Sequence, residues 1–137
     1  MAIWNKFNDF VEQLALKNHN LNTDTIMIML TNEQPLATDT VKSDMAELSA
    51  GNGYTAGGAD SQNTATESGG TLTVVGVDIT WTCDTAPMGP FKFAVAYNNT
   101  GATKYLVGWY EYGGASITLQ IGEQFKVDFG ATWFTIA

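Results

Sequence analysis

Apolar side chains recur at helical spacing near the start of the chain. The residues that fall on one side of such a helix are Trp4, Phe7, Phe10, Val11 and Leu14. The pattern predicts an amphipathic helix over residues 3–17, within an N-terminal segment 1–20, and the Asn- and Asp-rich run "KNHNLNTD" at residues 17–24 ends it. Its polar side holds two lysines among acids and amides, which gives anionic lipid little to bind. We therefore expect the helix to pack on its own sheet or on a partner, and we expect no membrane contact.

From residue 25 the pattern changes to that of strands. Residues 25–31, "TIMIMLT", form an apolar run between turn-forming residues, which predicts a strand buried on both faces. Met27 and Met29 are expected to fill the core, because no cysteine or histidine accompanies them as a metal ligand. Residues 32–70 are a long polar excursion. A loop of this size is unusual in a compact domain, so we expect part of it to pair as edge strands and part to lie on a neighbouring molecule.

The second half of the chain has the alternation of β-structure throughout. Strands are predicted at residues 71–82, 91–98, 105–112, 117–121, 125–129 and 133–137. Strict alternation in the first of these places one set of side chains on a common face: Val75, Val77, Ile79 and Trp81. Short strands with turn signals at about every 8–12 residues are typical of an antiparallel β-sandwich or barrel. We therefore predict a mainly β single domain over residues 1–137, with residues 71–137 as its strand-rich core and one N-terminal helix.

The predicted strand 105–112 carries bulky side chains on both faces. Alternation places Val107 and Trp109 on one face, and Tyr110 and Tyr112 on the other. One face of an antiparallel sheet packs on the core, so the other aromatic face needs a cover. The N-terminal helix, a partner subunit or a ligand could provide it.

Charge and cysteine content narrow the choice of partners. The chain has 137 residues and a net charge of −8, with six lysines and no arginine. Nucleic acid and phosphate are therefore poor partners, because the field repels polyanions and the arginine fork is missing. Cys83 is alone and cannot form an internal disulfide. Without a recognisable secretory signal, we expect the chain to be made and folded in a cytoplasm.

A glycine-rich stretch, "GNGYTAGG" at residues 51–58, raises the question of phosphate binding. A phosphate loop needs a strand before it, a helix after it and, for nucleotides, a Lys-Ser/Thr end. Here the glycines are followed by "ADSQ", with neither a helix pattern nor a Lys-Ser/Thr pair. They are therefore expected to supply positive φ angles in tight turns. Tyr54 in this loop is then either an interface anchor or a side chain folded back on the sheet.

Candidate catalytic groups form no coherent set. His19 lies at the predicted helix end, where a capping role or a cation at the negative end of the dipole is expected. Cys83 precedes Asp84, which disfavours a thiolate. The acids on strands, Asp78, Glu111 and Asp128, are scattered as on solvated faces. We therefore expect no enzyme activity, no metal site and no cofactor.

Several segments together resemble small virion proteins of tailed bacteriophages. They are "WNKFNDFVEQLA" with "HNL", "MLTNEQPLATDT", "SAGNGYTAGG", "GPFKFAVAYNNT", "LVGWYEYG" and "SITLQIGEQFKVDF". The likeness runs collinearly over nearly the full chain, and it is greatest to head decoration, or cement, proteins of jelly-roll type. It implies a jelly-roll-like sandwich and a non-enzymatic protein that binds the outside of the capsid as a homo-oligomer.

The partners that the resemblance implies are the major capsid protein and further copies of the chain, with a trimer favoured over a dimer. The location is then the capsid surface of the virion, after synthesis in the host cytoplasm. Aromatic residues are the expected anchors of these protein interfaces. The candidates are Trp4, Phe7, Tyr54, Trp109, Tyr110, Tyr112 and Trp133.

Two alternatives stay open. A tail-associated structural protein is the same kind of molecule at another place on the virion. A carbohydrate-binding module that recognises host glycan, by stacking sugars on Trp109, Tyr112 or Trp133, belongs to a different class. An enzyme is the least favoured reading, because acid, base and nucleophile are not brought together.

Overall fold

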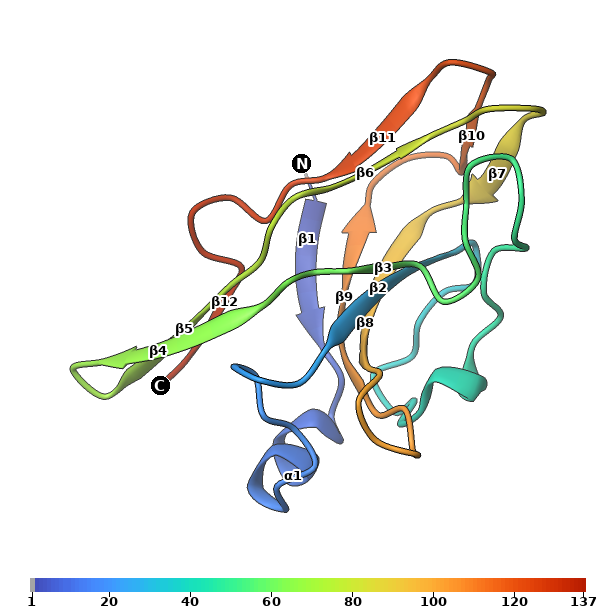
Figure 1. Cartoon of the computed structure of the whole chain (residues 1–137). Coiled ribbons are helices and arrows are strands. Elements are labelled where there is room, and N and C mark those ends of the chain that lie inside the picture. Colours follow the sequence, from blue (N-terminus) through green and yellow to red (C-terminus); the bar gives the residue numbers. More distant parts are fainter. Residues whose placement is uncertain (1) are drawn as a thin grey trace.

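The computed structural model describes residues 2–137, and it is mainly β with antiparallel strand pairing throughout (Figure 1). The largest sheet has five strands in the order β1 (Ala2–Lys6), β9 (Leu106–Tyr112), β8 (Phe93–Asn98), β2 (Ile26–Thr31) and β3 (Ala59–Asp60). A three-stranded sheet consists of β12 (Phe134–Ile136), β5 (Thr71–Val75) and β4 (Thr64–Ser68). Two ribbons pair β11 (Gln124–Val127) with β6 (Ile79–Thr82), and β10 (Ile117–Leu119) with β7 (Met88–Phe91). The helical segments are α1 (Phe10–Ala15) and the 3₁₀ turn η1 (Lys42–Asp44).

The N-terminal helix predicted over residues 3–17 is wrong in its first half. Residues Ala2–Lys6 form the edge strand β1, paired with β9, and α1 has only six residues. The spacing of Trp4 and Phe7 fits one turn of a helix, but it fits equally a strand that contains Trp4 and ends just before Phe7. In the structure these two rings belong to different hydrophobic clusters, one on each side of the five-stranded sheet.

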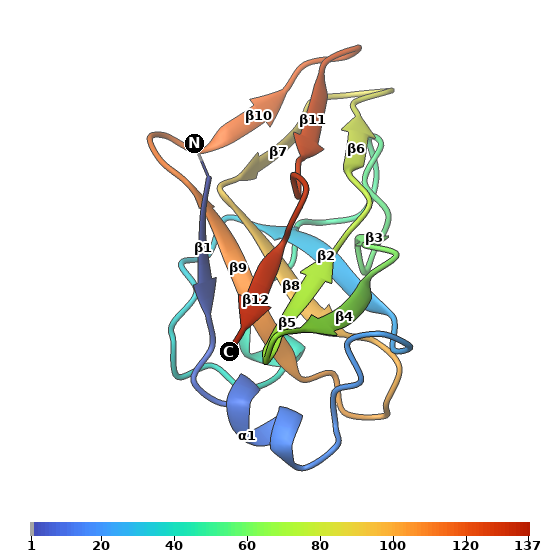
Figure 2. The same ribbon diagram turned by 90° about the vertical axis from the view of Figure 1, so that its left-hand side faces the viewer.

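The five-stranded sheet is covered on both faces by the chain itself. The main core lies between it and the β5, β6, β11 and β12 strands, and β2 contributes Ile26, Ile28 and Leu30 to it. A second cluster on the opposite face contains Met29 and Met45. Figure 2 shows β5 and β12 in front of the sheet and the chain of residues 32–50, in cyan to green, behind it. The prediction that β2 is buried on both faces is confirmed.

The polar excursion at residues 32–70 divides into two parts. Its last third supplies β3 and β4, each at the edge of a sheet, as predicted. The earlier part lies on the chain's own sheet, and its expected contact with a neighbouring molecule stays a prediction. Backbone bonds hold it in place, because Lys42 N donates to Lys104 O at 2.8 Å, Leu106 N to Thr40 O at 3.0 Å and Leu48 N to Leu30 O at 2.8 Å.

The predicted strand 71–82 is two strands with a break at residues 76–78. Val74, Ile79 and Trp81 are buried, whereas Val77 is 51% exposed. The predicted common face of Val75, Val77, Ile79 and Trp81 is therefore wrong, since the break shifts the alternation by one residue. Gly76 permits the break to pack closely, because a Cβ there would lie 2.9 Å from the Phe129 ring.

A β-bulge in β9 changes the faces of its side chains. Gly108 pairs with Ala96 and Leu106 pairs with Tyr97, so β9 holds one extra residue at Val107. As a result Leu106 and Trp109 share one cluster, and Val107 and Tyr110 share the other. The prediction from strict alternation, that Val107 and Trp109 lie on the same face, is therefore wrong.

Candidate functional site

The seven predicted interface aromatics do not form one exposed surface. Five of them are buried within the chain: Phe7, Tyr54, Trp109, Tyr110 and Trp133. Trp4 and Tyr112 are partly buried and pack against the main core. Trp4 stacks on Phe134 with ring centroids 5.4 Å apart and meets Trp133 edge-on at 5.3 Å. The premise that these rings need a partner to cover them is therefore not met, because the second half of the fold and residues 32–58 cover them.

The glycine-rich stretch 51–58 makes tight turns, as predicted. Its four glycines all have φ between 82° and 118°. Two of them also touch neighbouring backbone, because a Cβ on Gly53 would lie 2.0 Å from Thr82 O and one on Gly58 would lie 1.8 Å from Ile28 O. The loop therefore fits against β2 and β6 only with glycine at these positions.

Tyr54 folds back from this loop into the main core, where it is 3% exposed. Its hydroxyl donates to Glu47 Oε2 at 2.6 Å and accepts a hydrogen bond from Leu30 N at 3.1 Å. The same Glu47 oxygen accepts from Gly57 N at 2.6 Å, and Lys42 Nζ lies 2.9 Å from the other oxygen. Burial and the bond to Glu47 raise the pKa of Tyr54 well above its ordinary value. Of the two sequence interpretations of Tyr54, the structure shows the intramolecular one.

Glu47 is thus the centre of a network that sequence reasoning missed. It fixes η1, the glycine-rich loop and β2 to one another through one carboxylate. The only signal in the sequence is a single acid in the short apolar stretch "MAEL". That signal does not distinguish a solvated acid from one that is bonded within the fold.

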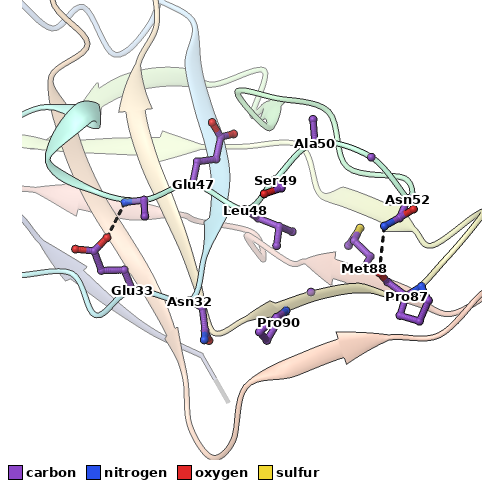
Figure 3. Close-up of a pocket in the computed structure, with 13 residues that line it drawn as sticks. Asn32, Glu33, Glu47, Leu48, Ser49, Ala50, Asn52, Pro87, Met88 and Pro90 are labelled. Carbon is purple, nitrogen blue, oxygen red and sulfur yellow. Dashed lines mark hydrogen bonds between the residues drawn. The ribbon is translucent and has the colours of Figure 1, made fainter.

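A groove lies beside this network, between residues 46–52 and β7 (Figure 3). Its volume is about 360 Å³. Leu48 and Met88 point into the space between the two walls. Asn52 Nδ2 donates to Pro87 O at 3.2 Å at one end, and Glu33 Oε2 accepts from Ala46 N at 2.7 Å toward the other. Most of the remaining lining is small: Ser49, Ala50, Gly51 and Gly89.

The sheet topology explains why the groove exists. β2 pairs with β8 only as far as Thr31, opposite Phe93. The chain preceding β8 runs on as β7, which pairs with β10 on one side. Within residues 2–137 no strand pairs with β7 on the other side, in line with β2. The groove therefore lies beside a strand that has a pairing partner on one side only, and Pro90 in its wall has no backbone N–H to donate.

His19 is buried, and the hydrogen-bond contact that its ring makes within residues 2–137 is with the Asn98 side chain. Asn98 Nδ2 lies 3.1 Å from its Nδ1, and among residues 2–137 its Nε2 has no hydrogen-bond partner. Burial lowers the pKa of His19 from 6.5 to about 4, although Asp24 and Asp9 act in the opposite direction. The expected cation at a helix end is therefore wrong, because the imidazole is neutral at ordinary pH.

This burial predicts a pH-dependent stability. Unfolded His19 binds a proton below pH 6.5 and folded His19 does so only near pH 4, so this contribution is complete above pH 6.5 and is lost as the pH falls. The free energy of unfolding is expected to be about 2 kcal/mol lower at pH 5 than at pH 7. Urea unfolding at both pH values measures the difference. In His19→Gln the difference should nearly vanish, and an unchanged pH dependence in that variant would contradict the assignment.

The other predicted chemical groups lie apart or are bonded within the chain. The buried Cys83 thiol donates to Ala86 O at 2.9 Å. Asp78 pairs with Lys126 at 3.1 Å and accepts a hydrogen bond from Phe129 N, and these contacts lower its pKa. In the described part of the chain, no group of three or more His, Cys, Asp or Glu side chains is placed to hold a metal ion.

Comparison with known protein families, curated proteins and solved structures gives no match to this chain. Among the helical segments of residues 2–137, none has the length and apolar character needed to span a membrane.

Proposed function

We propose that the chain is a non-enzymatic structural protein of a bacteriophage virion, which binds the outer surface of the head and stabilises the shell. The proposal includes a jelly-roll-like sandwich as the finer description of the fold. It also includes the major capsid protein as partner and a homo-oligomer, a trimer rather than a dimer, as the bound form. The family resemblance of the sequence suggests the virion, and the groove beside β7 supports a protein-binding role.

The open position next to β7 is the observation that carries this proposal. An extended segment of a partner can add to a sheet edge by backbone hydrogen bonds, with little demand on its side chains. Small residues such as Ser49, Ala50 and Gly89 leave room for such a backbone. The opposite wall is fixed by the Glu47 network, so docking requires little ordering of the groove itself.

Charge and copy number fit the same role. The net charge of −8 favours a partner segment that carries lysine or arginine. Each contact can be weak, because an oligomer bound to a symmetric lattice engages several sites at once and gains from effective concentration. Binding that exists only on the closed shell then stabilises that shell by mass action.

Co-sedimentation with undecorated shells of the parent phage tests the proposal. Ala50→Trp fills the groove and is expected to reduce binding to the shells at least about tenfold, since the partner backbone is excluded. Ala56→Trp is the matched control, because Ala56 is also exposed and on the same segment but does not line the groove. Equal binding by both variants would refute the role of the groove.

The shells themselves decide the rest of the proposal. Wild-type protein should raise the temperature at which packaged DNA escapes, and imaging of particles should place it on the head. Failure of the wild-type protein to bind shells would overturn the proposed function. Density on the tail would replace the head location by the tail-associated alternative.

A further inference from the structure

Another cavity lies at the C-terminal end of β9, between this strand and residues 126–130. Its volume is about 380 Å³. The side chains that line it with polar groups are Tyr110, Tyr112, Lys126 and Asp128, and Ala2, Phe129 and Gly130 complete it. None of these residues lines the groove beside β7, so any ligand here is independent of the proposed shell contact.

The two tyrosines are held rigidly by their rings. They are two residues apart on β9 and beyond the bulge, so they share one face of the strand. Tyr112 meets Phe125 edge-on at 5.0 Å, and Tyr110 lies 6.1 Å from Phe129. Neither hydroxyl makes a hydrogen bond with any of residues 2–137, although both residues line the cavity. Two phenols whose hydroxyls have no partner among residues 2–137 therefore line the cavity.

The hydroxyls keep their protons at any physiological pH. Burial raises the pKa of Tyr110 to about 12, with a further contribution from Asp128. The pKa of Tyr112 is raised for the same reason. Each phenol can therefore donate one hydrogen bond and accept another.

The charges of the cavity are nearly balanced. Lys126 is paired with Asp78 at 3.1 Å. Asp128 Oδ1 accepts from Gly130 N at 2.8 Å, and its Oδ2 makes no bond with residues 2–137. That oxygen can accept a hydrogen bond from a ligand. The carboxylate disfavours an anionic ligand, and the phenols and the free carboxylate oxygen favour a ligand that can form hydrogen bonds with them.

We propose that this cavity binds a neutral carbohydrate. A sugar ring offers several hydroxyls that both donate and accept, which matches two phenols and a carboxylate oxygen placed together on an aromatic support. Trp109 and Trp133, the other rings considered for sugar stacking, are buried in the core and do not reach the cavity. Of the three rings that the sequence offered for sugar stacking, only Tyr112 lines the cavity, together with Tyr110 and Asp128.

A glycan array probed with the purified full chain tests the proposal, followed by calorimetric titration of the neutral sugars that bind. Tyr112→Phe keeps the ring and removes the hydroxyl, and Asp128→Asn removes the charge. Each is expected to weaken binding at least about tenfold, because a buried polar group of the complex loses its partner. Tyr105→Phe, a change on the same chain segment outside the cavity, should bind like wild type.

Three results would overturn the proposal: no neutral sugar bound at millimolar concentration, sugar binding unaffected by both cavity variants, or equal loss in Tyr105→Phe. Thermal unfolding of each variant verifies that it is folded at the assay temperature. Because the array uses the isolated protein and the sedimentation assay uses shells, failure of sugar binding leaves the proposed shell contact unaffected, and the reverse also holds.

Discussion

Gly58→Ala is expected to destabilise the protein by about 3–5 kcal/mol, the largest effect of any substitution considered. The φ of Gly58 is +82°, which disfavours any side chain, and a Cβ there would lie 1.8 Å from Ile28 O and 2.6 Å from Ile28 C. Those atoms belong to the middle of β2, which cannot move without disturbing β8. The loop must instead lift away from the sheet, and the pairing of β3 with β2 is lost with it.

Urea unfolding followed by tryptophan fluorescence measures this change. Gly69→Ala is the matched control, because Gly69 also has a positive φ, +61°, but nothing lies within 4 Å of its Cβ position. Backbone strain alone is expected there, at about 1 kcal/mol. Similar losses in the two variants would show that the close approach to β2 is not what requires glycine at residue 58.

Glu47→Ala is expected to cost about 3 kcal/mol of unfolding free energy. The substitution removes the acceptor of the Tyr54 hydroxyl and of Gly57 N, and it leaves Lys42 without its ion-pair partner. Tyr54→Phe should cost about 2 kcal/mol, because it leaves Leu30 N without an acceptor in the core. Since the two side chains share one hydrogen bond, the double variant should lose less than the sum of the single losses.

Denaturant unfolding and amide hydrogen exchange check this prediction together. In Glu47→Ala, the amides of Leu30 and Gly57 should exchange faster than amides that exchange only by global unfolding, because both are bonded within the network. Glu67→Ala is the control. Its carboxylate also accepts one backbone hydrogen bond, from Gly70 N at 2.8 Å, but in an exposed turn. If Glu67→Ala is as destabilising as Glu47→Ala, the network around Glu47 contributes no more to the free energy of unfolding than a single exposed hydrogen bond does.

Periodicity predicted the β-structure well where strands are regular. The run at residues 25–31 gave β2 with both faces buried, and the alternation from residue 91 onward gave β8 and β9. It failed where one residue changes the alternation. Neither the bulge at Val107 nor the break at residues 76–78 is visible in a hydropathy pattern, because both depend on how the strands pair with their neighbours.

The site was less accessible to sequence reasoning than the fold. The glycine-rich loop marks Tyr54 in the sequence, but whether its ring faces in or out depends on Glu47, seven residues earlier, and on β2. Trp4 was assigned to a helix because spacing alone does not include the hydrogen bonds that β9 offers to β1. The groove beside β7 forms where residues 46–52 pass that strand, which is a property of the fold and not of any motif.

The cover formed by residues 32–58 has a consequence for aggregation. Its first part, residues 40–46, attaches through backbone hydrogen bonds of Thr40 and Lys42 and through the Met45 side chain, so local opening of that part uncovers the second cluster. Opening exposes apolar side chains of the five-stranded sheet to solvent, among them Phe93, Val95 and Leu106. Two molecules opened in this way expose the same apolar surface and can associate through it. At high concentration, aggregation is therefore expected at temperatures below that of global unfolding.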